Sequence, residues 1–279
     1  MTAARDSRVW FGALALGLLV ALALAAPLVT TIGPSEQAQV VATRFLPPFS
    51  TDINGVLHPL GTDRLGRDVW SRLLHGARLS LGVGALAVFL STALGVAIGA
   101  VAGASQGLLR AGLLGLTDFA LALPRVVLLL LLAALWRPSA ALVVVVLGLT
   151  GWMSVARLVY GEARGVMEQP FVECARALGG RRLRIVGRHV LPNVLTPALV
   201  AAALGFGNAI MLEAGLSFLG VGVQPPAASW GTMIASGRDT LVNAPWVSLA
   251  PGIALVLVVV ASTLLSDGLQ DAYDPARRR

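Results

Sequence analysis

Long apolar runs constrain the fold of this chain more than any other feature. A helix needs about 20 apolar residues to cross a bilayer, and six segments are close to that length. The predicted spans are residues 9–29, 79–101, 113–136, 140–159, 194–221 and 246–265. Strands of a membrane barrel alternate over about ten residues and give a much weaker signal. The sequence therefore predicts an all-α, polytopic membrane helical bundle with six transmembrane helices.

The composition agrees with a membrane protein. Of the 279 residues, 56% are hydrophobic and 13% are charged, whereas a soluble domain carries about 25% charged residues. The formal net charge is +7, and all 21 basic residues are Arg. In a soluble protein this excess would suggest nucleic acid, but basic residues also collect at the cytoplasmic edge of a membrane. We therefore expect a lipid bilayer and no nucleic acid as a partner.

The distribution of Arg predicts the orientation of the spans. Residues 157–192 hold seven Arg against three Glu, and the chain ends in three Arg at 277–279. Residues 30–78 hold five Arg that four acidic residues nearly balance. The positive-inside rule therefore places both termini and residues 157–192 in the cytoplasm. The first run also resembles a signal peptide, but its length favours a retained span.

These patterns divide the chain into three parts. Residues 1–30 form the N-terminal tail and the first span, and residues 31–78 form an external loop with an interfacial helix at about 68–80. Residues 79–279 form the membrane core, with a cytoplasmic loop at 160–193. Within span two, Gly95, Gly99 and Gly103 lie on one face and predict close helix packing.

The loop between spans four and five has its own helical pattern. Phe171, Ala175 and Leu178 share one face of a short helix, which the glycines at 179 and 180 can end. A second short helix at about 182–190 can follow before Pro192 interrupts the chain. This compact basic unit is suited to a groove on another protein. The alternative is a solvated loop that binds anionic lipid headgroups.

Several motifs resemble one family of transporters. Glu173-Cys174-Ala175, Gly179 and Leu191-Pro192 resemble the EAA signature of permease subunits in bacterial ABC importers. HPLGTDRLGRDVWSRLLHGAR at 58–78 and EAGLSFLGVGVQPPAASWG at 213–231 resemble the C-type subunit of its dipeptide/oligopeptide/nickel permease family. The resemblance extends over nearly the whole chain. Cys174 departs from the signature, and Arg125 stands where an apolar residue is expected.

The resemblance implies a type I ABC importer permease (MetI-like) fold in the bacterial cytoplasmic membrane. It implies four partners: a second, similar permease subunit, two cytoplasmic ATPase subunits and an external substrate-binding protein. The two permeases would enclose the translocation pathway, and ATP hydrolysis would occur on the partner subunits. Di- and oligopeptides come first among the implied substrates, but nickel, another small chelate or a glutathione-like solute stays open.

The resemblance also assigns roles to individual residues. The loop at 160–193 would be the coupling loop that docks on an ATPase. Its candidate coupling residues are Glu173, Cys174, Ala175, Arg176, Gly179, Arg181 and Arg184. In this interpretation Glu173 pairs with a basic group of the ATPase, the small residues permit close approach, and the arginines steer the partner.

A few polar side chains lie within the predicted spans. Ionisable residues there are costly and are functional candidates by default, so Glu213 and Arg125 are assigned to the substrate pathway, together with the polar but uncharged Asn208. For Glu213 the alternative is a structural hydrogen bond near the outer end of its helix. Asp118 and Arg125 are seven residues apart and lie on similar faces of one helix, about 10.5 Å apart along its axis.

Other functions are less compatible with the sequence. A chain without Lys has no Walker P-loop, so no bound nucleotide, catalytic residue or other cofactor is predicted. Cys174 is the only cysteine, and no His/Cys cluster indicates a metal site. A stand-alone secondary transporter or channel would leave the basic loop unexplained, and an intramembrane serine protease would need a GxSxG-like turn and a His within a span.

Overall fold

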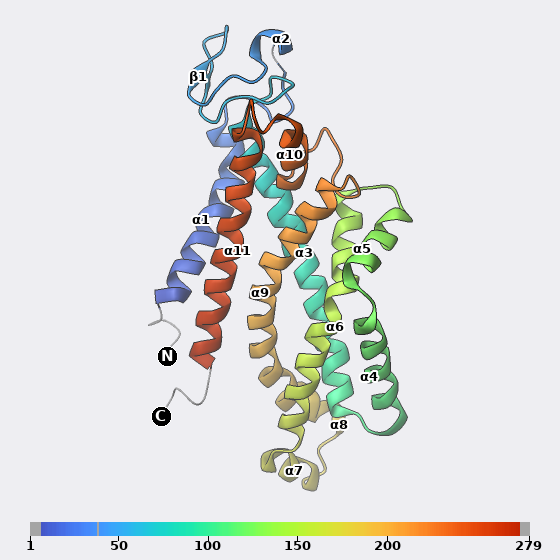
Figure 1. The fold of residues 1–279 in the computed structure, drawn as a ribbon. Helices are drawn as coiled ribbons and strands as arrows, with labels where there is room; N and C mark the ends of the chain where they lie inside the picture. Colours follow the sequence, from blue (N-terminus) through green and yellow to red (C-terminus); the bar gives the residue numbers. More distant parts are fainter. Residues whose placement is uncertain (1–6, 38, 274–279) are drawn as a thin grey trace.

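The computed structural model describes residues 7–37 and 39–273, and it is almost entirely helical (Figure 1). The three C-terminal arginines of the orientation prediction lie outside the described residues. Within the described residues, five helices are long and apolar enough to cross a membrane, and a sixth span is present if one strongly bent pair of helices is counted as one. The predicted all-α membrane bundle is confirmed. The five long helices are α1 (Ser7–Val29), α3 (Val69–Ala104), α6 (Ala140–Met167), α9 (Leu191–Phe218) and α11 (Trp246–Tyr273).

Helix α3 is continuous where the sequence predicted an interfacial helix followed by a span. It has 36 residues and no proline, which gives a length of about 54 Å, well beyond the roughly 30 Å of a hydrocarbon core. Asp68 caps its first turn, since its side chain accepts a hydrogen bond from the Ser71 N–H. The helix therefore joins the outer segment rigidly to the bundle.

The third predicted span is not one helix. Helices α4 (Gly107–Ala122) and α5 (Arg125–Ala134) are bent by 88° relative to each other at Leu123-Pro124. A residue before proline avoids the helical region, and Leu123 is accordingly extended, with ψ 133°. The prediction of a single helix over 113–136 is therefore wrong, and the bend exposes the first turn of α5. The turn at 137–139 is present, and Ser139 caps α6.

Helix α3 lies in the centre of the bundle and packs mainly against α6 and α9, while α1 packs against α11 (Figure 1). The α3–α6 contact uses the predicted glycines. A Cβ on Gly99 would lie 2.5 Å from the Ala156 carbonyl oxygen, and one on Gly95 would lie 2.5 Å from the Val155 Cβ. The close packing predicted from this glycine pattern is present.

One end of the bundle is covered by the segment before α3 and by α10 (Trp230–Gly237), which continues as a 3-10 turn at Arg238–Thr240. The covering segment contains α2 (Val40–Thr43) and the strands β1 (Ser50–Thr51) and β2 (Leu57–His58), which pair antiparallel with Ser50 opposite His58. The opposite end carries α7 (Pro170–Ala177) and α8 (Arg182–Ile185). Helix α1 begins and α11 ends toward that second end (Figure 1).

Candidate functional site

The loop that resembles a coupling element is a compact helical unit at one end of the bundle (Figure 1). We refer to residues 170–190, which comprise α7, α8 and the π-helical turn η2 (Val186–Val190), as the α7–η2 segment. Two hydrogen bonds end α7: the Gly180 N–H donates to Ala175 O and the Gly179 N–H to Arg176 O, both at 2.9 Å. This is the Schellman arrangement, and it places Gly179 at φ 81°. The predicted helix stop at the two glycines is present.

Pro192 does not interrupt the chain as predicted. It occupies the first turn of α9, and helical structure runs without a break from Arg182 to Phe218. Proline cannot donate a backbone hydrogen bond and its ring crowds the carbonyl four residues earlier. The wider π turn just before Pro192 relieves this crowding, because the Leu191 N–H bonds to Val186 O, five residues back. The segment is therefore continuous with a spanning helix.

Contacts with the bundle hold the α7–η2 segment in place. Within the segment, Val172 and Ile185 are buried. The ring centroids of Phe171 and His189 lie 5.6 Å apart. The Arg182 guanidinium donates to Ala104 O, the last carbonyl of α3. Sequence reasoning missed Arg182, although a cation at a helix C-terminus is a common stabilising arrangement.

The outward face of the segment mixes apolar and charged side chains. Leu178 is 88% exposed, Leu183 87% and Phe171 46%, so part of the predicted apolar face is free of the bundle. Ala175 is half-buried. The other candidate coupling residues are all exposed: Glu173, Cys174, Arg176, Gly179, Arg181 and Arg184. A surface of exposed leucines with charges at its edge is suited to bury itself against a partner.

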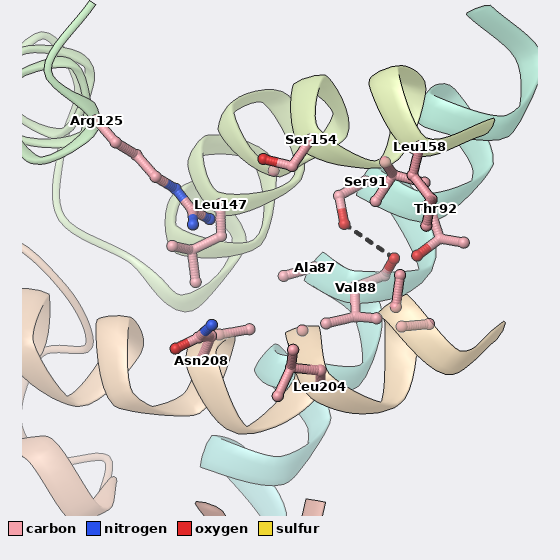
Figure 2. A pocket seen from close by; sticks show the side chains of 16 residues that line it. Ala87, Val88, Ser91, Thr92, Arg125, Leu147, Ser154, Leu158, Leu204 and Asn208 are labelled. Atoms are coloured by element: carbon pink, nitrogen blue, oxygen red, sulfur yellow. Dashed lines mark hydrogen bonds between the residues drawn. The ribbon is translucent and has the colours of Figure 1, made fainter. Parts of the chain in front are cut away.

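A cavity of about 310 Å³, lined mainly by apolar residues with a few polar side chains among them, lies among α3, α5, α6 and α9 (Figure 2). It brings together two of the three predicted pathway residues, Arg125 from α5 and Asn208 from α9. Sequence reasoning missed the hydroxyl residues beside them, because they come from helices far apart in the chain. These are Ser91, Thr92 and Ser154.

Arg125 is not paired with Asp118, although the sequence placed both on similar faces of one helix. The 88° bend separates their two helices, so the predicted axial spacing does not apply. Asp118 instead forms an ion pair with Arg157 of α6. Within the part of the chain that the structure describes, the Arg125 side chain makes no hydrogen bond or ion pair.

Glu213, the third predicted pathway residue, does not line this cavity. It is completely buried and accepts hydrogen bonds from Ser80 Oγ at 2.9 Å and Ser217 Oγ at 2.8 Å. The Ser80 hydroxyl also accepts from the Trp230 N–H. Glu213 thus joins α3, α9 and the start of α10, which is the kind of contact that the sequence left open as the alternative.

The end opposite the α7–η2 segment holds a buried cluster of charged groups. The Asp63 carboxylate accepts from the Arg67 side chain at 2.7 and 2.8 Å and lies 3.8 Å from Arg72 Nε. His58 Nδ1 lies 2.8 Å from Asp68, the residue that caps α3. Hydrogen bonds from the N–H groups of Val56 and Asn54, together with nearby His58, hold the pKa of Asp52 below its ordinary value. The motif at 58–78 therefore makes this part of the molecule rigid. We call residues 39–72, which end in the first turn of α3, the outer cover.

A bundle of apolar helices long enough to cross a membrane places this chain in the class of integral membrane proteins. The comparisons with known proteins define the family within that class. Residues 95–279 match the model of the family described as binding-protein-dependent transport system inner membrane component. The chain belongs to this family, and the resemblance stated from its motifs is confirmed.

Individual relatives agree with this assignment. The chain is 40% identical over 264 residues to a putative peptide transport system permease protein of Brucella suis, covering 95% of this chain and 86% of the relative. It is 40% identical over 266 residues to the di/tripeptide transport system permease protein DppC of Pseudomonas aeruginosa, with the same coverage. A putative peptide permease protein of Brucella suis is 43% identical over 220 residues, which are 78% of this chain and 73% of that protein.

Proposed function

We propose that this chain is a permease subunit of an ATP-driven importer of di- and oligopeptides. The named activities of its relatives support peptides as the substrate class. The observation that carries the proposal is the α7–η2 segment, whose apolar and charged residues face outward while its inner residues fix it to the bundle. The chain has no Lys and hence no Walker P-loop, so ATP is hydrolysed by partner subunits.

In this proposal the α7–η2 segment is the coupling element. Leu178 and Leu183 enter a groove of an ATPase subunit, Glu173 pairs with a basic group there, and Arg176, Arg181 and Arg184 steer the encounter. Cys174 and Ala175 are small enough for close approach. Movement of the ATPase passes to α9 through the unbroken helix from Arg182 and to α3 through the Arg182–Ala104 hydrogen bond.

The remaining partners follow from the two ends of the bundle. The end with the α7–η2 segment and both chain termini faces the cytoplasm of a bacterium, and the rigid outer cover faces the binding protein that delivers the solute. A second permease subunit completes the pathway along the cavity that holds Arg125 and Asn208. Domain organisation follows the same division, with the outer segment at 31–78 and the permease core at 79–279.

Reversal of one charge tests the coupling role. The variant Glu173→Arg should assemble in the membrane but lose most ATPase co-purification and ATP-dependent peptide uptake, because it places a cation opposite the basic group of the ATPase. The measurement uses the complete importer in proteoliposomes. Glu36→Arg is the matched control for ATPase co-purification, since Glu36 is also exposed but lies in the segment at the other end. Normal ATPase binding and uptake by Glu173→Arg would refute the proposed docking.

A further inference from the structure

The cavity among α3, α5, α6 and α9 carries a positive charge that no described residue balances. Arg125 lines it, and none of the described residues around it is acidic. Its remaining polar groups are the Asn208 amide and the hydroxyls of Ser91, Thr92 and Ser154. The Thr92 hydroxyl is buried without a hydrogen-bond partner. A cation within a membrane bundle is costly and is retained where it faces a cavity that has a use for it.

The surroundings of Arg125 leave room for a ligand at the guanidinium. Gly151 of α6 lies beside it, and a Cβ there would come within 3.7 Å of Arg125 Nη2 and 2.9 Å of the Ser91 Cβ. Figure 2 shows the guanidinium extending into the cavity toward the side where Asn208 lies. The only nearby acid in the same predicted span, Asp118, is already held by Arg157.

The position of Arg125 in its helix adds to the attraction for anions. Arg125 is the first residue of α5, and no side chain caps that helix. The first backbone bond is made by the Leu128 N–H to Pro124 O, so the N–H groups before it lack helical partners. The positive end of α5 therefore lies at the Arg125 backbone, and the side chain carries the guanidinium from there into the cavity.

We propose that Arg125 is a specificity-determining residue that receives the free carboxylate of a solute in transit, with Asn208, Thr92 and Ser154 as further hydrogen-bond donors, since the Ser91 hydroxyl already donates to Val88 O. A guanidinium binds a carboxylate through two parallel hydrogen bonds. Moving an ionised carboxylate out of water costs much free energy unless an opposite charge and hydrogen bonds compensate for the lost hydration. Arg125 supplies this charge and hydrogen bonds along the path. This inference rests on the proposed peptide import, since every peptide with an unmodified C-terminus carries such a group.

The test compares a dipeptide with its C-terminal amide, for example dialanine and dialanine amide. The complete importer is reconstituted in proteoliposomes, and its binding protein is saturated with each peptide in turn. The quantity measured is the uptake ratio of acid to amide for Arg125→Gln divided by the same ratio for the unchanged importer. The binding protein's own preference is common to both ratios and cancels.

We expect Arg125→Gln to lower this acid-to-amide ratio by about tenfold, the effect of one charged hydrogen bond. Arg125→Lys keeps the charge but loses the bidentate geometry, so its ratio should lie between those of the unchanged importer and Arg125→Gln. Asn208→Asp is an independent variant that retains Arg125 and should lower the ratio as well, because its carboxylate neutralises the guanidinium. Arg137→Gln is the matched control: it removes an arginine that does not line this cavity, and its ratio should not change.

The outcomes separate this inference from the proposed function. If the unchanged importer moves neither peptide, peptide import itself fails. If it moves both and the ratio is the same for Arg125→Gln and Asn208→Asp, the carboxylate site is refuted while the importer assignment stands. If Arg125→Gln instead prevents assembly and Asn208→Asp leaves the ratio unchanged, Arg125 pairs with the second permease and the inference is overturned.

Discussion

The outer cover and the α7–η2 segment both carry many charged side chains, but they place them in opposite environments. In the cover, Asp63, Arg67 and Asp68 are buried and bonded to one another or to the backbone. In the α7–η2 segment, Glu173 and its neighbouring arginines are exposed. Charges that are already paired fix the shape of the subunit. Charges that point into water are available to another protein.

The apolar residues do not follow this contrast, because the cover also exposes large apolar side chains, with Val41 at 84% and Phe49 at 78%. The cover is tied to the bundle by specific contacts, for example the hydrogen bond from Trp246 Nε1 to Thr62 O. The α7–η2 segment buries only a few side chains and leaves Leu178 and Leu183 almost fully exposed. Exposed leucines beside charged residues gain free energy when a partner covers them. The difference between the two ends therefore lies in their charges: the buried charges of the cover are paired within this chain, whereas the exposed charges of the α7–η2 segment are available to a partner.

Removal of the Asp63 carboxylate tests whether the buried charges fix the shape of the outer cover, and it has the largest expected effect. Asp63→Ala leaves Arg67 buried without its partner, and Arg72 loses a nearby opposite charge. Breaking a buried pair costs about 3–5 kcal/mol. We expect a large drop in the thermal unfolding temperature of the detergent-solubilised subunit and rapid proteolysis within residues 31–68.

The control for this prediction is Asp239→Ala, which removes a carboxylate whose pairing with Arg238 is exposed to water. Exposed pairs contribute little to stability, so the unfolding temperature should hardly change. Equal stability of Asp63→Ala and Asp239→Ala would mean that the buried cluster does not fix the cover.

The sequence was sufficient for the features that depend on local pattern. Runs of apolar residues located the spans, the glycines at 95, 99 and 103 located the close α3–α6 contact, and Gly179-Gly180 located the end of α7. Each of these depends on residues within one or two helical turns. The family motifs added the family of the chain, which no local pattern by itself could give.

The features that sequence reasoning missed depend on distant residues meeting in space. Averaged hydropathy cannot distinguish a straight span from two apolar helices bent at Leu123-Pro124, so the 88° bend was not predicted. The Arg182–Ala104 hydrogen bond joins residues 78 positions apart. Asn208 and Arg125 were separate candidates until the folded chain placed them around one cavity.

The backbone conformation at Gly179 provides a second test of the comparison, with an expected effect of intermediate size. Its φ of 81° lies in the left-handed region, and no atom lies near the position of an added Cβ. Gly179→Val should therefore strain the end of α7 through its backbone alone, by about 1–2 kcal/mol. Gly179→Asn should be much milder, since Asn adopts this conformation more readily.

The measurement for these two variants is hydrogen exchange of residues 170–190 together with ATP-dependent uptake. Gly179→Val should raise exchange in the segment and reduce uptake, while residues 44–72 of the cover keep their protection. If Val and Asn at position 179 behaved alike, the positive φ would not be what the segment requires, and close contact with the partner would be the better explanation.

The smallest expected effect on the subunit itself comes from Arg184→Ala. Arg184 is exposed, so the unfolding temperature of the isolated subunit should change by less than about 2 °C. ATPase association should nevertheless become slower and less sensitive to salt, because a charge at the edge of an interface acts mainly on the encounter rate. Arg64→Ala removes the same charge from an exposed position at the outer end and should leave association unchanged. Equal association rates for the two variants across a salt series would show that the exposed arginines of the α7–η2 segment do not steer the ATPase.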